Sequence, residues 1–261
     1  MRPYSSIWLI VVMLIGVHAT DAFAKISDKK GLYILLLADE KDHGPAGNGL
    51  HDYPLWQERW QDLLSTKGAF DGTPDVQVAK AWHWPSEEQF QKADLIVAYC
   101  YLEWTDERLD QVRKFLERGG GLVLIHSASW TKPEPSPGVA EVVGVGGFEL
   151  FRHGPVKLDL VAPEHPVCAG LPSTILLEND ETYWPPTPLM ENVVVLATSL
   201  EEKGARGSTP RAAQPVFWCY EPGRGRVFGC VPGHSIQTFE NPDFQKLLLQ
   251  GMNWAANTLG K

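Results

Sequence analysis

Continuous apolar runs alternate with helical patterns along the first half of the chain. Apolar runs occur at residues 31–38, 94–100 and 121–125. Runs without polar alternation are typical of parallel strands that are buried on both faces. Residues 105–118 have apolar positions at helical spacing, with acidic residues first and basic residues last, as the helix dipole favours. Further elements are expected as a helix at 56–64, a strand at 75–82 and a short helix opened by a capping box at Ser86.

The second half of the chain favours strands. Residues 156–161 alternate between apolar and polar side chains. Asn241 and Pro242 are typical of the start of a final helix. Further strands are expected at 175–184, 193–198, 214–220 and 224–230, the last two forming a hairpin. Because right-handed crossovers join successive parallel strands, the pattern predicts an α/β fold with a three-layer, doubly wound, mainly parallel sheet and an added β-hairpin.

Residues 1–24 are typical of a signal peptide. Arg2 precedes an apolar run at 7–17, and Ala22-Phe23-Ala24 is a cleavage signal. The apolar run is short for a permanent membrane anchor. We therefore expect cleavage after Ala24, a periplasmic or secreted protein without stable membrane insertion, and a single domain over residues 25–261. An uncleaved, anchored form is the alternative.

The composition limits the classes of partner. The 261 residues include 23 Lys and Arg against 32 Asp and Glu, a net charge of −9, without a basic cluster. Such a chain is a poor nucleic-acid binder. Neither G-x-G-x-x-G nor the P-loop motif occurs, so we expect no nucleotide cofactor. The four cysteines are too widely spaced to identify a disulfide or a cysteine-based zinc site. The ten tryptophans suit a carbohydrate partner, although packing accounts for most of them.

Several polar side chains follow predicted strands directly. Ligands bind at the carboxyl ends of strands in open α/β sheets. His126 follows the run at 121–125, and His234 follows the last hairpin strand. Three further residues, Tyr101, Glu103 and Trp104, follow the run at 94–100. We therefore expect these side chains to gather at one edge of the sheet.

Two other segments add titratable groups to this set. A glycine-rich loop at 39–54 follows the first strand and carries His43 and His51. Such a loop packs poorly for its own sake, which favours a functional role. Asp180 and Glu181 are adjacent, beside Tyr183 and Trp184. Because side chains alternate along a strand, we expect only one of the two carboxylates to face the site.

Five segments together resemble the ThuA-like (trehalose utilisation) family, which has the class I glutamine amidotransferase-like fold. They are Gly119–Ala128, His165–Leu171, Asp180–Tyr183, Gln214–Trp218 with Gly223–Phe228, and Pro232–His234. The resemblance implies an amidotransferase-like core without amidotransferase chemistry. Cys100 ends a different strand from the one that carries the nucleophile in those enzymes, and Ser127 lacks the G-x-S-x-G context. We therefore expect neither residue to act as a nucleophile.

The resemblance, joined to the residues above, predicts a sugar-active protein of carbohydrate catabolism related to trehalose or a keto-sugar. Neutral histidines near pH 7 can bind a divalent metal or move a proton, and three imidazoles with a carboxylate suit Zn²⁺. Family context suggests isomerisation, elimination or hydrolysis of a keto-sugar. The expected metal ligands are His43, His126 and His234; the expected catalytic residues are His126, Glu181 and Glu103; the expected substrate-binding residues are His43, Tyr101, Trp104, Tyr183 and Trp184.

Two alternatives remain open at this point. A non-catalytic carbohydrate-binding module would use the aromatic side chains as platforms and would need no convergent titratable groups. A glycosidase would need two carboxylates at a defined separation, and Glu103 with Glu181 is the pair that we nominate. A homo-oligomer is compatible with either. The histidines favour an enzyme over a binding module.

Overall fold

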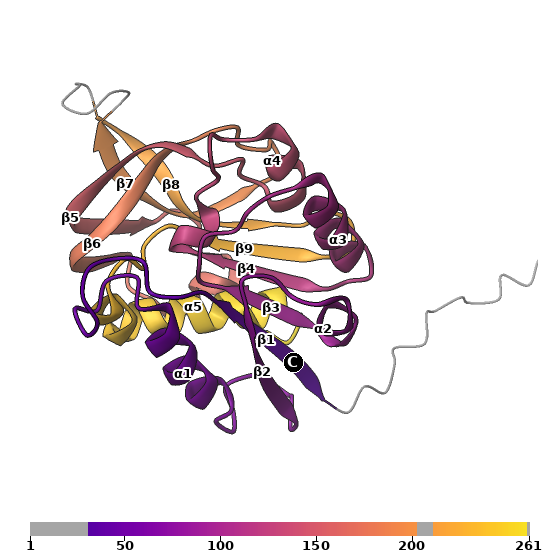
Figure 1. The fold of residues 1–261 in the computed structure, drawn as a ribbon. Coiled ribbons are helices and arrows are strands. Elements are labelled where there is room, and N and C mark those ends of the chain that lie inside the picture. Colours follow the sequence, from indigo (N-terminus) through magenta and orange to yellow (C-terminus); the bar gives the residue numbers. More distant parts are fainter. Residues whose placement is uncertain (1–30, 203–210, 260–261) are drawn as a thin grey trace, which may run out of the picture.

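The computed structural model describes residues 31–202 and 211–259. The predicted signal peptide, residues 1–24, lies outside the described residues. A nine-stranded sheet runs through the described part, with helices against it (Figure 1). The strands are β1 (Leu32–Ala38), β2 (Val76–Trp82), β3 (Leu95–Ala98), β4 (Gly121–Ile125), β5 (Phe148–Leu160), β6 (Thr174–Pro186), β7 (Val194–Glu202), β8 (Arg211–Tyr220) and β9 (Arg226–Cys230). The helices are α1 (Tyr53–Leu64), α2 (Glu87–Lys92), α3 (Asp106–Glu117), α4 (Pro137–Val143) and α5 (Pro242–Ala255), with short 3₁₀ helices η1 (His126–Ser129), η2 (Pro166–Cys168) and η3 (Ile236–Glu240).

The sheet is half parallel and half antiparallel, in the order β2-β1-β3-β4-β9-β8-β7-β5-β6. The neighbours from β2 to β9 pair in parallel. Those from β9 to β6 pair antiparallel. The predicted α/β class is confirmed. The sheet is mixed, however, so the prediction of a mainly parallel sheet is not confirmed. Buried and exposed positions alternate along much of β5, as expected of an antiparallel strand with one solvated face, whereas β3 and β4 are buried throughout.

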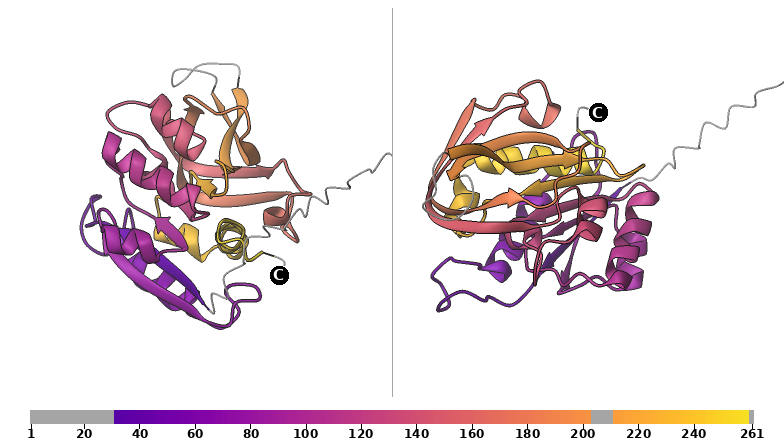
Figure 2. Two further views of the ribbon diagram at one scale, coloured as in Figure 1. Left: turned by 90° about the vertical axis from the view of Figure 1, so that its right-hand side faces the viewer. Right: turned by 90° about the horizontal axis from the view of Figure 1, so that it is seen from above.

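Helices cover both faces of the parallel half (Figure 2). Phe90 of α2 and Phe115 of α3 gather around Ile96 and Leu122 on one face. Helix α5 packs against β3, β4 and β9 on the other face, and α1 packs against β1 and β2. Within the described residues, no helix has the length and apolar character needed to cross a bilayer.

The predicted hairpin of β8 and β9 lies in the middle of the sheet rather than at its margin. Strand β9 pairs in parallel with β4 and antiparallel with β8. The hairpin therefore joins the two halves of the sheet. Cys219 lies opposite Phe228, and Cys230 lies opposite Phe217. All four cysteines of the chain are buried free thiols.

The local signals of the sequence place most helix starts correctly. Ser86 forms the predicted capping box, Thr105 caps α3, and Asn241 caps α5. Two elements extend beyond the prediction. Helix α4 is not among the predicted elements, because it is short and has no side-chain cap at its N-terminus. Strand β5 begins at Phe148 instead of residue 156.

Candidate metal centre

The loop that follows β1 folds back over the carboxyl edge of the sheet. Leu50 forms an isolated β-bridge with Ser235, and the backbone N–H of His51 donates to the carbonyl of His234 at 3.0 Å. His51 has a positive φ of 42°, which turns the chain at this point. These contacts place the imidazole of His51 beside that of His234.

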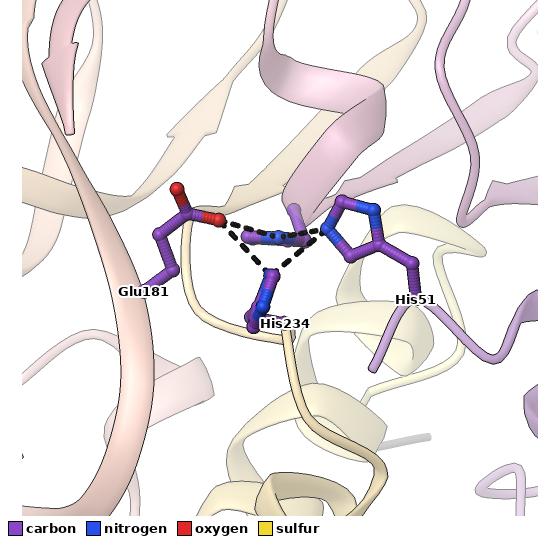
Figure 3. Close-up of side chains that lie close together, drawn as sticks. His51, Glu181 and His234 are labelled. Atoms are coloured by element: carbon purple, nitrogen blue, oxygen red, sulfur yellow. Dashed lines mark hydrogen bonds and ion pairs between the residues drawn. The ribbon is translucent and has the colours of Figure 1, made fainter. Parts of the chain in front are cut away.

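Four buried side chains converge at this edge (Figure 3). Nε2 of His51 lies 2.9 Å from Nε2 of His126 and 3.0 Å from Nδ1 of His234. Oε2 of Glu181 lies 3.0 Å from Nδ1 of His234 and 3.4 Å from Nε2 of His126. The residues come from the loop after β1, from η1, from β6 and from the segment after β9. We call His51, His126, Glu181 and His234 the His/Glu cluster.

The outer nitrogens of two of these rings are held by acceptors. Nδ1 of His126 lies 2.7 Å from the carbonyl oxygen of Val231, and Nδ1 of His51 lies 2.7 Å from Oδ1 of Asp42. Each Nδ1 must therefore carry the proton. In the neutral rings, both Nε2 atoms then present lone pairs to each other across 2.9 Å.

Two facing lone pairs in a buried site are unfavourable unless a hydrogen-bond donor or a cation takes them up. Burial lowers the pKa of His51 to about 4, with the neighbouring His126 and His234 acting in the same direction and Asp42 opposing them. His51 is therefore neutral at pH 7. The candidate ligand atoms of the His/Glu cluster all lie within 4.8 Å of one another, so the cluster could hold a metal ion. Outer acceptors that orient ligating histidines are typical of metal centres.

The carboxylates are charged at neutral pH. Burial acts to raise the pKa of Glu181, but the neighbouring imidazoles of His126 and His234 outweigh it and hold the pKa below the ordinary value. In the same way, burial is outweighed at Asp42, where His51 and His43 lower the pKa to about 2. The cluster therefore pairs a charged carboxylate with imidazole lone pairs, which is the donor set that borderline divalent cations prefer.

Asp180 fixes the backbone rather than contributing to the donor set. It is buried, and its Oδ1 accepts hydrogen bonds from the N–H groups of Gly233 at 2.9 Å and His234 at 3.1 Å. Its Oδ2 accepts the hydroxyl of Thr238. The expectation that one of the two adjacent carboxylates faces the site holds for Glu181, while Asp180 orients the segment that carries His234.

A second layer of hydroxyl groups lies behind the imidazoles. The hydroxyl of Tyr53 lies 2.9 Å from Nδ1 of His51 and 2.8 Å from Oγ of Ser127. Ser127 is fully buried, and its described partner is a phenol rather than a base. Burial raises the pKa of the Cys100 thiol. This environment suits neither Ser127 nor Cys100 as an activated nucleophile.

The structure brings together only part of the site predicted from sequence. His126, Glu181, His234 and Tyr183 meet in or against the cluster, with the hydroxyl of Tyr183 3.0 Å from Nε2 of His126. His43 lies beside the cluster, its ring centroid 4.3 Å from that of His51 and its side chain half exposed.

The other predicted site residues lie further out. Tyr101 is partly buried, its ring 5.9 Å from that of His51. Trp104 packs against Trp84. Trp184 is buried, one position along β6 from Tyr183 and so on the opposite face.

Glu103 does not join Glu181 in the structure. The Glu103 side chain is 79% exposed and pairs with Arg108 at 3.4 Å. It is absent from the group of described residues that could hold a metal with Glu181. Glu103 is therefore not part of the His/Glu cluster that contains Glu181.

His51 and Asp42 are the main residues at the cluster that the sequence prediction omitted from the site. Both lie on the glycine-rich loop that the sequence singled out. The signal was the presence of two histidines eight residues apart, but the bridge between Leu50 and Ser235 decides which of them enters the cluster. His51, rather than the predicted His43, joins His126 and His234 in the group that could hold a metal.

Acid is expected to destabilise the metal-free protein through His51. Its pKa is about 4 in the folded chain and ordinarily 6.5, so the unfolded chain binds the extra proton between these values. The contribution of neutral His51 to the free energy of unfolding should be fully present above pH 6.5. About 2–3 kcal/mol of it should be lost as the pH drops to 4. Urea unfolding at pH 7, 5.5 and 4.5 measures this loss. His51→Asn, which tolerates the positive φ, should show a smaller slope, and equal slopes would contradict the assignment.

Comparisons with known proteins agree with this architecture. The family model of ThuA, described as trehalose utilisation, matches residues 27–255. A ThuA-like protein from Bacteroides uniformis ATCC 8492 superposes with a TM-score of 0.66 at 18% identity, covering 87% of this chain and 91% of that one. A ThuA-like protein from Parabacteroides merdae ATCC 43184 gives 0.61 at 21%, covering 89% and 92%.

More distant similarity reaches an enzyme that is much longer. β-Galactosidase from Bacillus circulans sp. alkalophilus gives a TM-score of 0.53 at 14% identity, covering 87% of this chain and 30% of that one. Identities this low show a shared fold and nothing more. No curated protein matches the chain. Because the family model covers most of the sequence, the chain belongs to the ThuA (trehalose utilisation) family.

Proposed function

We propose that this protein is a metal-dependent enzyme that acts on an oxidised (keto) sugar in carbohydrate catabolism. The observation that carries the proposal is the pair of facing lone pairs on His51 and His126, held by Asp42 and the Val231 carbonyl. Membership of the trehalose utilisation family supports a sugar as the substrate class.

The proposed ligands are His51, His126, His234 and Glu181, with Zn²⁺ as the metal. Four of the six separations between these donor atoms are 2.9–3.4 Å, and all six are within 4.8 Å, which is compact enough for one metal ion. A bound Zn²⁺ would act as a Lewis acid on a sugar carbonyl or hydroxyl oxygen. The chain's own contribution is to orient the imidazoles and to keep the surroundings dry.

Exposed side chains next to the cluster are the proposed contacts for the sugar. His43 and His153 are each about half exposed, and Nε2 of His153 lies 3.5 Å from Oε1 of Glu181. Phe151 is 43% exposed, and Trp130 packs between Phe151 and Tyr183. Aromatic and imidazole groups together provide apolar faces with polar edges, which suit a sugar ring.

We further propose that the protein acts after export, as a single domain over residues 25–261. The basic start, the short apolar run and the Ala22-Phe23-Ala24 cleavage signal support removal of residues 1–24. The proposed partner is a small carbohydrate, and the net charge of −9 does not favour nucleic acid. The proposed location of the activity is the periplasm or the outside of the cell.

The test is turnover of a keto-sugar by the purified protein. Trehalose oxidised at one hydroxyl, and trehalose itself, are incubated with protein that has been stripped by a chelator and with protein reloaded with Zn²⁺. The concentration of each sugar is measured over time by NMR. We expect the oxidised sugar to be consumed only by the reloaded protein. Binding of the sugar without turnover would instead support the carbohydrate-binding module, which the exposed Phe151 favours. Neither binding nor turnover of either sugar would contradict both.

A further inference from the structure

The hydroxyl of Tyr183 touches atoms that the proposed metal would use. It lies 3.0 Å from Nε2 of His126 and 3.4 Å from Oε2 of Glu181. The ring is fully buried, stacks on His126 with centroids 5.0 Å apart and an interplanar angle of 20°, and meets Trp130 at 4.8 Å. Packing on two sides therefore fixes the direction of the phenolic O–H.

A metal at the His/Glu cluster changes what this hydroxyl can bind. Because Nδ1 of His126 donates to Val231, Nε2 is the acceptor for the Tyr183 hydroxyl in the metal-free protein. A metal takes that lone pair. The remaining described neighbour, Oε2 of Glu181, is itself a proposed ligand atom and lies at a long 3.4 Å. A buried hydroxyl without an acceptor is costly, at about 1–3 kcal/mol.

We propose that Tyr183 donates a hydrogen bond to the oxygen atom of an exogenous ligand at the His/Glu cluster, and so orients the carbonyl oxygen of the sugar. This assignment rests on the proposed function. It adds to that function the group that recognises the reacting oxygen of the sugar, the hydroxyl of Tyr183. The phenol would point at the position where negative charge develops on a polarised carbonyl, which is where a preorganised donor is most effective. Tyr183 thereby completes a site whose metal ligands supply no hydrogen-bond donor of their own.

The experiment compares Tyr183→Phe with the parent protein, both loaded with Co²⁺. Phenylalanine keeps the stacking on His126 and removes only the hydroxyl. The visible spectrum of Co²⁺ reports metal occupancy, and a titration with acetohydroxamate, a small oxygen ligand, reports binding at the metal. We expect Co²⁺ affinity to change by less than about threefold and acetohydroxamate affinity to fall about tenfold, the loss of one hydrogen bond to a charged group.

Tyr220→Phe is the matched control. Tyr220 is also buried, and its hydroxyl donates to the backbone carbonyl of Glu141 at 3.0 Å, outside the His/Glu cluster. This variant should bind Co²⁺ and acetohydroxamate as the parent does.

The possible outcomes separate the two proposals. Unchanged acetohydroxamate binding in Tyr183→Phe overturns the role of Tyr183 and leaves the metal centre standing. So does loss of Co²⁺ from that variant, or a tyrosinate charge-transfer band in the parent, because either would make Tyr183 a metal ligand. A Co²⁺-loaded parent that does not bind the probe also overturns the role of Tyr183. A parent that binds no Co²⁺ overturns the proposed function, and the role of Tyr183 with it.

Discussion

Replacing His126 by asparagine is expected to abolish metal binding and to leave the fold intact. His126 has a positive φ of 51°, which asparagine tolerates better than most residues. The side-chain amide of asparagine can take over the hydrogen bond to the Val231 carbonyl, but it lacks the Nε2 lone pair that faces His51. Loss of an outer partner of a ligand costs about 10–100-fold in metal affinity, and we expect the loss of a ligand to exceed that range.

The measurement is zinc per chain after dialysis, with circular dichroism as a check on folding. The parent should carry close to one equivalent and the His126→Asn variant almost none. His83→Asn is the control, because His83 also has a positive φ, of 57°, but its exposed side chain pairs with Asp39. The control should retain its zinc. Full zinc occupancy in His126→Asn would remove His126 from the metal centre.

Replacing Asp180 by alanine is expected to cause a large loss of stability. Its Oδ1 accepts the N–H groups of Glu181, Gly233 and His234, and its Oδ2 accepts the hydroxyl of Thr238. Alanine would leave these donors buried without an acceptor, at a cost of about 1–3 kcal/mol each before relaxation. We expect the free energy of unfolding to fall by roughly 3–5 kcal/mol, measured by urea denaturation.

Asp180→Asn tests the same site while keeping its shape. Asparagine retains an oxygen at the position of Oδ1, where the three N–H groups converge, and replaces Oδ2 by an amide nitrogen. It should therefore recover most of the stability that alanine loses. An alanine variant as stable as the asparagine variant would contradict the role of Asp180 as the acceptor that holds the segment of His234.

The sequence predicts the sheet edge of the site better than its contents. His126 and His234 follow strands, and the apolar runs before them identify those strands without tertiary information. Strand alternation predicts that only one of Asp180 and Glu181 faces the site, but it does not decide which. By contrast, the balance of parallel and antiparallel pairing depends on how the strands after residue 148 connect, which hydrophobic periodicity does not encode.

Selection among the loop residues was not predictable from the sequence. Local pattern gives His43 and His51 equal standing on the glycine-rich loop. The bridge of Leu50 to Ser235, 185 residues apart, buries His51 and leaves His43 half exposed. The same holds for Trp104, whose strand-end position suggested the site but whose ring packs on Trp84. Long-range contacts of this kind become visible only when the chain is folded.

The position of the His/Glu cluster at the seam of the sheet has a thermodynamic consequence. Its members come from both the parallel half and the antiparallel half, which the central hairpin joins. A ligand that binds only the folded chain adds about 2.7 kcal/mol at one hundred times its Kd. That free energy opposes any opening that separates His51 from the other three ligands. Hydrogen exchange at residues 39–52 would then slow as the free metal concentration rises. The opening of this loop would thus depend on the concentration of metal around the protein.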